Sequence, residues 1–400
     1  MRYAFIILLC ALTLSASALP KDSLPQTFLL KPAALAAVKQ QLQKGDPALQ
    51  QALKILLSDA DKALQHGPYS VVYKSKTPPG GSKHDYMSVG PYWWPDSSKA
   101  DGLPYIRKDG QVNPERFNIR DAEYYTALCR DVYTLGLAWF YTGRRAYSAK
   151  AVQQLRTWFL ADSTRMNPDL NYGQAIPGIT QGRGIGLIDT RNLTKLIDGV
   201  QLLKASPDLG AADYRGLQEW YRQFLQWMRT SSIGLDEADE HNNHGTWYDV
   251  QTVSIALFTG QPQLAREILQ LQTMPRIESQ LKEDGSQPHE LARTLSWNYS
   301  SMNLKGFFEL ALLAENVRID LWRYQTPGGK SLQKAFAWML PFAAGEKEWE
   351  YKQIKSLDYT TYVELAVEAQ QKYPQLNLAP LWKKYSAPAD ARLPVMLWAF

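Results

Sequence analysis

Apolar residues recur at steps of three and four positions along most of the chain after Pro32. This spacing places them on one face of an α-helix and therefore predicts helices. The strict alternation of apolar and polar residues that marks a half-buried β-strand is scarce. The segments with helical spacing are 33–45, 47–67, 122–143, 146–162, 191–205, 211–230, 248–260, 263–281, 301–317 and 329–345.

Several of these segments end at a glycine, as the helices of a hairpin commonly do. Repeated antiparallel helix pairs predict an all-α fold, either an (α/α) toroid or an incomplete barrel of helix hairpins, with ligands bound in a central cleft. No Ser/Gly-rich linker or block of charge divides the chain. We therefore expect residues 19–400 to form a single domain.

Two long segments, 75–115 and 163–190, interrupt the helical pattern. Irregular segments of this length inside a compact domain are usually either functional or disordered. Both contain Trp, Tyr or Pro residues, a composition that argues against disorder. We expect these two segments to form the walls or the roof of the cleft.

The N-terminal residues have the pattern of a secretory signal peptide. Arg2 is followed by an apolar run at 4–14 and by the small residues Ala16, Ser17 and Ala18. The run is too short to span a bilayer as a helix, and no later segment is apolar enough to do so. We predict cleavage after residue 18, export to the periplasm or beyond, and a mature chain that neither contacts a membrane nor contains an internal disulfide, because Cys129 is then its single cysteine.

The net charge of +5 and the pI near 8.9 give a mild preference for anionic partners. The Lys and Arg residues form no basic run, so nucleic acid is not an expected partner. The chain also contains 13 Trp and 22 Tyr, whose flat rings suit the faces of sugars but suit a protein core equally well. A carbohydrate partner is therefore one interpretation among others at this point.

The stretch DEHNNHGTWYD, residues 239–249, is difficult to explain as packing, because each buried amide or imidazole needs a hydrogen-bond partner. A structural interpretation is a polar helix start, since Asn caps helices well. His241 and His244 form an H-x-x-H pair, but no third ligand stands at a spacing typical of zinc. We predict no metal, and we interpret His241 as a neighbour that orients the site.

Four stretches of the sequence carry a family resemblance when they are taken together. They are YWWPDSSKADGLPYIRKDGQVNPE (92–115), GRGIGLID (182–189), NNHGTWYD (242–249) and DGSQPHELARTLSWNYS (284–300). In this order they resemble the alginate lyase family of polysaccharide lyases, and the resemblance runs from about Tyr86 to about Phe308. It implies a helical-toroid enzyme that cuts uronic-acid polymers by β-elimination, without an organic cofactor.

The resemblance also implies roles for Asn243, His244, Arg293 and Tyr299. The C5 proton of a uronate is a very weak acid, because its removal places a second negative charge beside the carboxylate. Asn243, His244 and Arg293 would neutralise that carboxylate with donors aimed at the developing charge. Tyr299 would take the C5 proton and protonate the departing O4, provided that nearby cations lower its pKa. For guluronate, whose proton lies on the opposite side of the ring, His244 remains an alternative base.

The spacing of Arg293 and Tyr299 leaves one geometric question open. Residues six apart on a continuous helix do not share a face, so either the backbone breaks between them or they approach the sugar from different sides. Arg183, between two glycines that let a ligand approach the backbone, is a candidate for holding a neighbouring carboxylate. The complete set of candidate substrate-binding residues is Trp93, Trp94, Tyr105, Arg183, His241, Tyr248 and His289.

Other interpretations stay open from sequence alone. Arg293 can instead pair with Glu290 on a helix surface, and Tyr299 can be an ordinary core residue. A glycoside hydrolase on the same kind of toroid would need two carboxylates. A non-catalytic glycan-binding protein would use only the aromatic loops. The preference among mannuronate, guluronate and glucuronate, the endo or exo mode and the oligomeric state are not indicated. The available carboxylates are Asp239, Glu240, Asp249 and Glu290.

Overall fold

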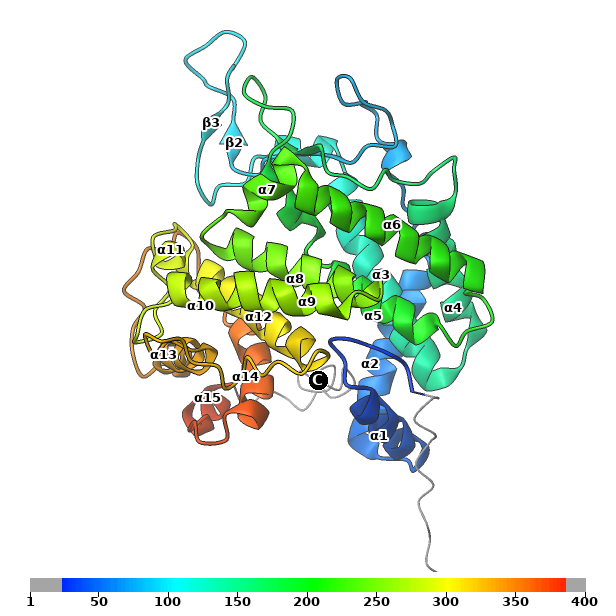
Figure 1. Cartoon of the computed structure of the whole chain (residues 1–400), viewed down its shortest axis with the longest axis vertical. Helices are drawn as coiled ribbons and strands as arrows, with labels where there is room; N and C mark the ends of the chain where they lie inside the picture. Colours follow the sequence, from blue (N-terminus) through cyan, green and yellow to red (C-terminus); the bar gives the residue numbers. More distant parts are fainter. Residues whose placement is uncertain (1–23, 386–400) are drawn as a thin grey trace, which may run out of the picture.

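The computed structural model describes residues 24–385, so the predicted signal peptide at 1–18 lies outside the described residues. Helices dominate the chain, as Figure 1 shows. They are α1 (Pro32–Gln43), α2 (Pro47–Leu64), α3 (Asp121–Thr142), α4 (Arg145–Leu155), α5 (Leu193–Leu203), α6 (Ala211–Thr230), α7 (Ser232–Ala238), α8 (Asn243–Phe258), α9 (Pro262–Ile268), α10 (Met274–Gln280), α11 (Pro288–Leu291), α12 (Ser296–Glu315), α13 (Leu332–Ala344), α14 (Thr360–Lys372) and α15 (Ala379–Lys384).

Shorter elements connect these helices. The π-helical turns η4 (Arg156–Leu160) and η6 (Leu269–Thr273) extend α4 and α9, and η6 leads directly into α10. Every segment with helical spacing coincides with one or more helices, so the periodicity is confirmed as a helix signal. The prediction omitted α7, α11, α14 and α15. The 3₁₀ helices are η2 (Val71–Tyr73), η3 (Pro114–Asn118) and η5 (Gly184–Thr190).

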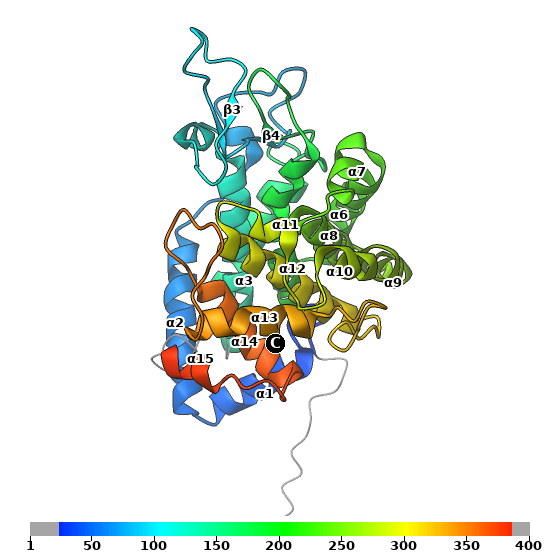
Figure 2. The ribbon, with the colours of Figure 1, turned by 90° about the vertical axis from the view of Figure 1, so that its left-hand side faces the viewer.

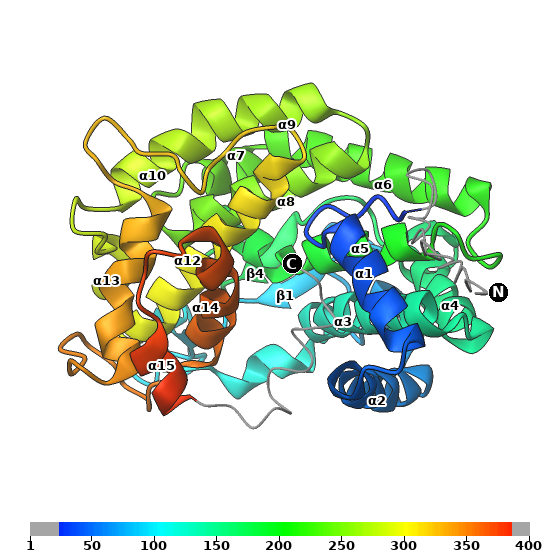
Figure 3. The ribbon, with the colours of Figure 1, turned by 90° about the horizontal axis from the view of Figure 1, so that it is seen from below.

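The helices pack on one another around a central group. Helix α3 packs against α4 and α5, and α8 packs against α9 and α12. In Figure 3, α2, α3 and α4 lie on one side of the molecule, α13, α14 and α15 on the other, and α6, α9 and α10 along a third. The predicted all-α fold is confirmed, and this arrangement is consistent with an incomplete toroid of helix hairpins. No helix among residues 24–385 has the length and hydrophobicity of a transmembrane span.

Helix α8 is the most enclosed of the long helices. All of its residues except His244 are buried, so it has no solvent-facing stripe. A helix that is apolar or buried all round belongs in the core of a protein. Its N-terminus nevertheless reaches the edge of the core, and this end carries the NNHG residues of the sequence motif.

The two irregular segments come together at one end of the molecule. Strand β1 (Met87–Val89) in the first segment pairs in parallel with β4 (Tyr172–Ala175) in the second. Within the first segment, β2 (Trp93–Trp94) pairs in antiparallel with β3 (Ile106–Arg107). Figures 1 and 2 show β3 and its neighbouring loops beyond the helical layers, at the end opposite α1 and α15.

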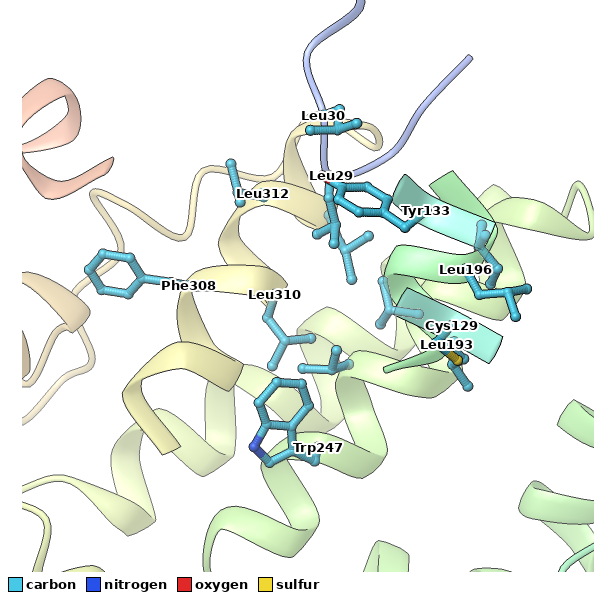
Figure 4. Packing of buried hydrophobic residues seen from close by; sticks show 14 of the residues in the cluster. Leu29, Leu30, Cys129, Tyr133, Leu193, Leu196, Trp247, Phe308, Leu310 and Leu312 are labelled. Carbon is cyan, nitrogen blue, oxygen red and sulfur yellow. The ribbon is translucent and has the colours of Figure 1, made fainter. Parts of the chain in front are cut away.

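The N-terminal part of the described chain is held by one buried carboxylate. The backbone N–H groups of Phe28, Leu29 and Leu30 donate to Asp198 of α5 at 2.7, 3.0 and 2.8 Å. Leu29 and Leu30 are buried, and Figure 4 shows Leu29 beside Tyr133 of α3. Burial raises the pKa of Asp198 to about 7, although the three N–H donors oppose the shift.

We expect Asp198→Ala to lower the free energy of unfolding by about 3 kcal/mol or more, because it leaves three buried N–H groups without an acceptor. Urea unfolding measures this loss. Since the folded-state pKa lies above the usual value of 3.8, the protonation-linked stability is complete below pH 3.8 and is lost as pH rises through about 7. The measurement therefore belongs on the acid side of pH 7. Asp59→Ala, an exposed residue paired only with Lys62, is the control, and an equal effect of both variants would contradict the prediction.

Candidate active site

A cleft of about 630 Å³ opens between the irregular segments and the ends of the central helices. Tyr92 and Trp93 come from the first irregular segment and Arg183 from the second, so the expectation that these segments wall the cleft is confirmed. Residues of α3, α8 and α12 and of the loops beside them also line it. The four residues expected to carry the chemistry, Asn243, His244, Arg293 and Tyr299, all line this one cleft.

Asn243 and His244 occupy the first turn of α8. The N-cap is Asn242, whose side chain accepts the backbone N–H of His244 at 2.8 Å. The structural interpretation of this motif as a helix start is therefore correct, but it accounts for Asn242 and not for its neighbours. Both Asn243 and His244 line the cleft.

A buried carboxylate holds each of these two side chains from behind. Glu290 of α11 accepts both the backbone N–H of Asn243 at 2.7 Å and its side-chain amide at 2.8 Å. Glu237 of α7 contacts Nδ1 of His244 at 2.8 Å. An ionised Glu237 is an acceptor, so Nδ1 carries a proton and Nε2 is the ring nitrogen available to a ligand. Burial alone would lower the pKa of His244, but the Glu237 carboxylate raises it above its usual value.

Arg293 lies in the break between α11 and α12, which resolves the question raised by its spacing from Tyr299. It does not form an ion pair with Glu290. Its Nη2 donates instead to Asp109 at 2.7 Å, across 184 positions of sequence. The guanidinium carbon lies 3.7 Å from the centre of the Tyr299 ring, a distance typical of a cation–π contact. Both residues therefore act on the same small region of the cleft.

Tyr299 occupies the first turn of α12, and its hydroxyl donates to the hydroxyl of Tyr92 at 2.8 Å. Burial and Tyr92 raise the pKa of Tyr299 well above its usual value, and Arg293 only partly opposes this shift. The condition that neighbouring cations lower this pKa below its usual value is not met, because burial outweighs the effect of Arg293. The phenol is protonated at neutral pH.

The structure brings only some of the candidate substrate-binding residues into the cleft. Trp93 and Arg183 line it, with the Arg183 guanidinium 5.8 Å from the Trp93 ring centre. The glycines beside Arg183 allow close packing against other backbone segments of the protein, and not the approach of a ligand. A Cβ on Gly182 would lie 2.0 Å from the carbonyl oxygen of Asn171.

The other candidates have partners outside the cleft. The Trp94 indole donates to the Gln111 carbonyl at 3.0 Å, and the Tyr105 hydroxyl donates to Glu115 at 2.6 Å. Tyr248 is buried in the core and donates to the Met228 carbonyl at 3.0 Å, because the α8 face that carries it points inward. His241 and His289 are exposed, with their ring centres 4.6 Å apart. None of these five residues lines the cleft.

Several residues of the site were not identified from sequence. Tyr92 opens the first motif but shows no distinguishing signal there. Asp109 and Glu237 reach their partners only through the fold. Among residues 24–385, no group of three His, Cys, Asp or Glu side chains is arranged to hold a metal.

The carboxylates suggested for a hydrolase are not paired across the cleft. Glu240 lines it, whereas Asp249 is buried against Arg276 at 2.9 Å and Glu290 is occupied by Asn243.

The alginate lyase family model matches residues 70–349, a range that contains the whole cleft. A solved alginate lyase from Bacteroides ovatus is 38% identical, with a TM-score of 0.89, over 93% of this chain and 99% of that chain. No match is found among curated proteins.

Two more distant structures share the fold. A variant of alginate lyase A1-III in complex with a tetrasaccharide is 18% identical, with a TM-score of 0.56, over 86% of this chain and 88% of that chain. The apo form is 17% identical, with a TM-score of 0.60, over 95% and 97%. The family model covers most of the chain, and a solved member is 38% identical to it. The cleft contains the four residues that the family resemblance implied. The chain belongs to the alginate lyase family.

Proposed function

We propose that the protein cleaves alginate, of polymannuronate or mixed type, by β-elimination at the uronate held beside Asn243, His244, Arg293 and Tyr299. As a member of its family it is a polysaccharide lyase. The observation that carries the proposal is the convergence of these four side chains, from two helices and the break between α11 and α12, in one cleft. A related polyuronate such as glucuronan is the alternative substrate.

The first task of such a site is to neutralise the uronate carboxylate. Arg293 offers a charged fork, and His244 has a raised pKa that favours its charged form. The buried amide of Asn243 completes the set. Because these donors are held by protein carboxylates before a ligand arrives, they need little reorganisation as charge develops on the sugar.

The second task is to move two protons. The C5–H bond breaks and its electrons form the C4–C5 double bond, while the C4–O4 bond breaks and O4 takes a proton. The protonated Tyr299 can donate directly to O4. In that case another base, His244, takes the C5 proton. If Tyr299 does both, its own proton passes to solvent before the reaction, Arg293 above its ring stabilises the phenolate, and the phenolate takes the C5 proton and passes it to O4. The product carries a C4–C5 double bond at its new non-reducing end.

His244 is the alternative base, in particular for guluronate. The contact between Nδ1 and Glu237 leaves Nε2 as the reactive nitrogen, an arrangement that suits a general base when the ring is neutral. The two roles need opposite charge states of His244. The pH dependence of the reaction therefore distinguishes them.

We further propose that the protein is exported and that residues 19–400 form one catalytic domain. The pattern at residues 1–18 supports export. Residues as far apart as Tyr92 and Met302 line one cleft, which supports a single domain.

Incubation with polymannuronate, polyguluronate, mixed alginate and glucuronan should produce alkene absorbance with at least one polymer. Tyr299→Phe should lower that rate by roughly 10²–10⁴, the usual contribution of a general acid or base. Tyr73→Phe, an exposed tyrosine outside the cleft, should retain normal turnover. Near-normal turnover by Tyr299→Phe would remove this tyrosine from the mechanism. Chain shortening without absorbance would identify a hydrolase, and binding without shortening would identify a glycan-binding protein.

Glu237→Gln should move one limb of the pH profile of kcat/KM toward lower pH, because the pKa of His244 falls when the adjacent negative charge is lost. If charged His244 neutralises the substrate, the alkaline limb moves, since activity is lost when the ring deprotonates. If neutral His244 is the base, the acidic limb moves. A profile unchanged in both limbs would show that the titration of His244 does not control the reaction.

A further inference from the structure

The arginines of the cleft fall into two electrostatic classes. Four of them have a carboxylate within ion-pair distance, with Arg107 and Arg293 sharing Asp109. For Arg183 and Arg191, by contrast, no carboxylate among residues 24–385 lies within 4.0 Å. The four paired arginines are Arg107 with Asp109, Arg116 with Glu123, Arg130 with Asp131, and Arg293 with Asp109.

The guanidinium of Arg191 makes fewer hydrogen bonds within the protein than that of Arg183. Its Nη1 donates to the Ile188 carbonyl at 3.0 Å, whereas Arg183 makes two bonds to Gln174. The nearby carboxylate of Asp189 is occupied elsewhere. It accepts from Tyr86, Ser88 and Gln174 at 3.0, 2.6 and 2.9 Å. Burial lowers the pKa of Arg191 below its usual value, as it does for Arg183.

Arg116 adds a second incompletely paired group to the same region. Its Nη2 lies 3.2 Å from Glu123, but its Nε is buried without a hydrogen-bond partner. Arg116 and Arg191 both line the cleft, and each lies within the electrostatic field of the other. Two cations that repel one another, with unused N–H groups and a shared cavity, favour an anion between or beside them.

The location of Arg191 separates it from the other unpaired arginine. Arg183 precedes η5 and Arg191 follows it. A 3₁₀ helix rises about 2.0 Å per residue, so the eight steps from Arg183 to Arg191 place the two backbone positions roughly 16 Å apart. The two side chains therefore enter the cleft from opposite ends of η5.

We propose that Arg191, together with Arg116, binds the carboxylate of a second uronate, in a subsite separate from the reacting sugar beside Tyr299. The inference rests on the proposed function, because a polyuronate presents a carboxylate on every sugar. This subsite selects chains that carry a negative charge beyond the scissile bond, and it contributes binding energy without touching the atoms that react.

Arg191→Gln is the primary test, assayed with polymeric substrate and with oligouronates of increasing length. We expect kcat/KM on the polymer to fall by roughly 10- to 100-fold, as for the loss of a hydrogen bond to a charged group. The loss should appear mainly in KM. On the shortest oligomer that the unmodified protein cleaves, the variant should match it, because that chain does not reach Arg191. This last measurement also shows that the variant is folded.

Two further variants make the result specific. Arg191→Lys keeps the charge but not the fork, so it should recover part of the lost affinity for the polymer. Arg145→Gln removes one positive charge outside the cleft, from an exposed arginine paired with Asp208, and should leave KM unchanged. Equal KM values for Arg191→Gln and the unmodified protein on every chain length would overturn the subsite. An unmodified protein that cleaves no polyuronate would instead overturn the proposed function.

Discussion

The hydrogen bonds from Asn243 to the buried Glu290 fix where α8 begins relative to the turn that carries Arg293. Glu290 stands three residues before Arg293, so one short segment both holds the amide and presents the guanidinium. A carboxylate buried in this way is stable only with its donors in place, because an unpaired buried charge is very unfavourable. The relative position of α8, α11 and α12 is therefore set by electrostatics as well as by apolar packing.

Carboxylates of the protein orient the other donors of the site in the same way. Glu237 sets the ring of His244, and Asp109 sets Arg293 from a loop far away in sequence. In each case a protein anion faces a group whose proposed partner is a sugar anion. The protein itself thus orients the donors, and its carboxylates partly balance their positive charge. Arg183 and Arg191 depart from this balance.

Much of the fold could be predicted from sequence, and the reasons are local. Helices such as α6 have a strong apolar stripe, so their spacing identifies them. Helix α8 has no such stripe because it is buried all round, and for this reason the sequence could not show that Tyr248 faces the core. The motif residues of the site were found because they stand close together in sequence.

What sequence could not supply depends on contacts between distant positions. Asp109 and Arg293 are 184 positions apart, and no spacing rule relates them. The break after α11 follows from tertiary packing, so the relation between Arg293 and Tyr299 stayed open. A lowered pKa was a condition for the role of Tyr299 as base, and the sequence did not reveal the burial that raises this pKa instead.

The carboxylate of Asp198 has a consequence for the order in which the chain acquires its structure. Its three N–H donors lie 168 to 170 positions earlier in sequence. These bonds can form only after α5 has been synthesised and has brought Asp198 into the core. Residues 28–30 therefore dock on a helix that is made much later than they are, and a free segment at these residues should mark molecules that have not finished folding during biosynthesis.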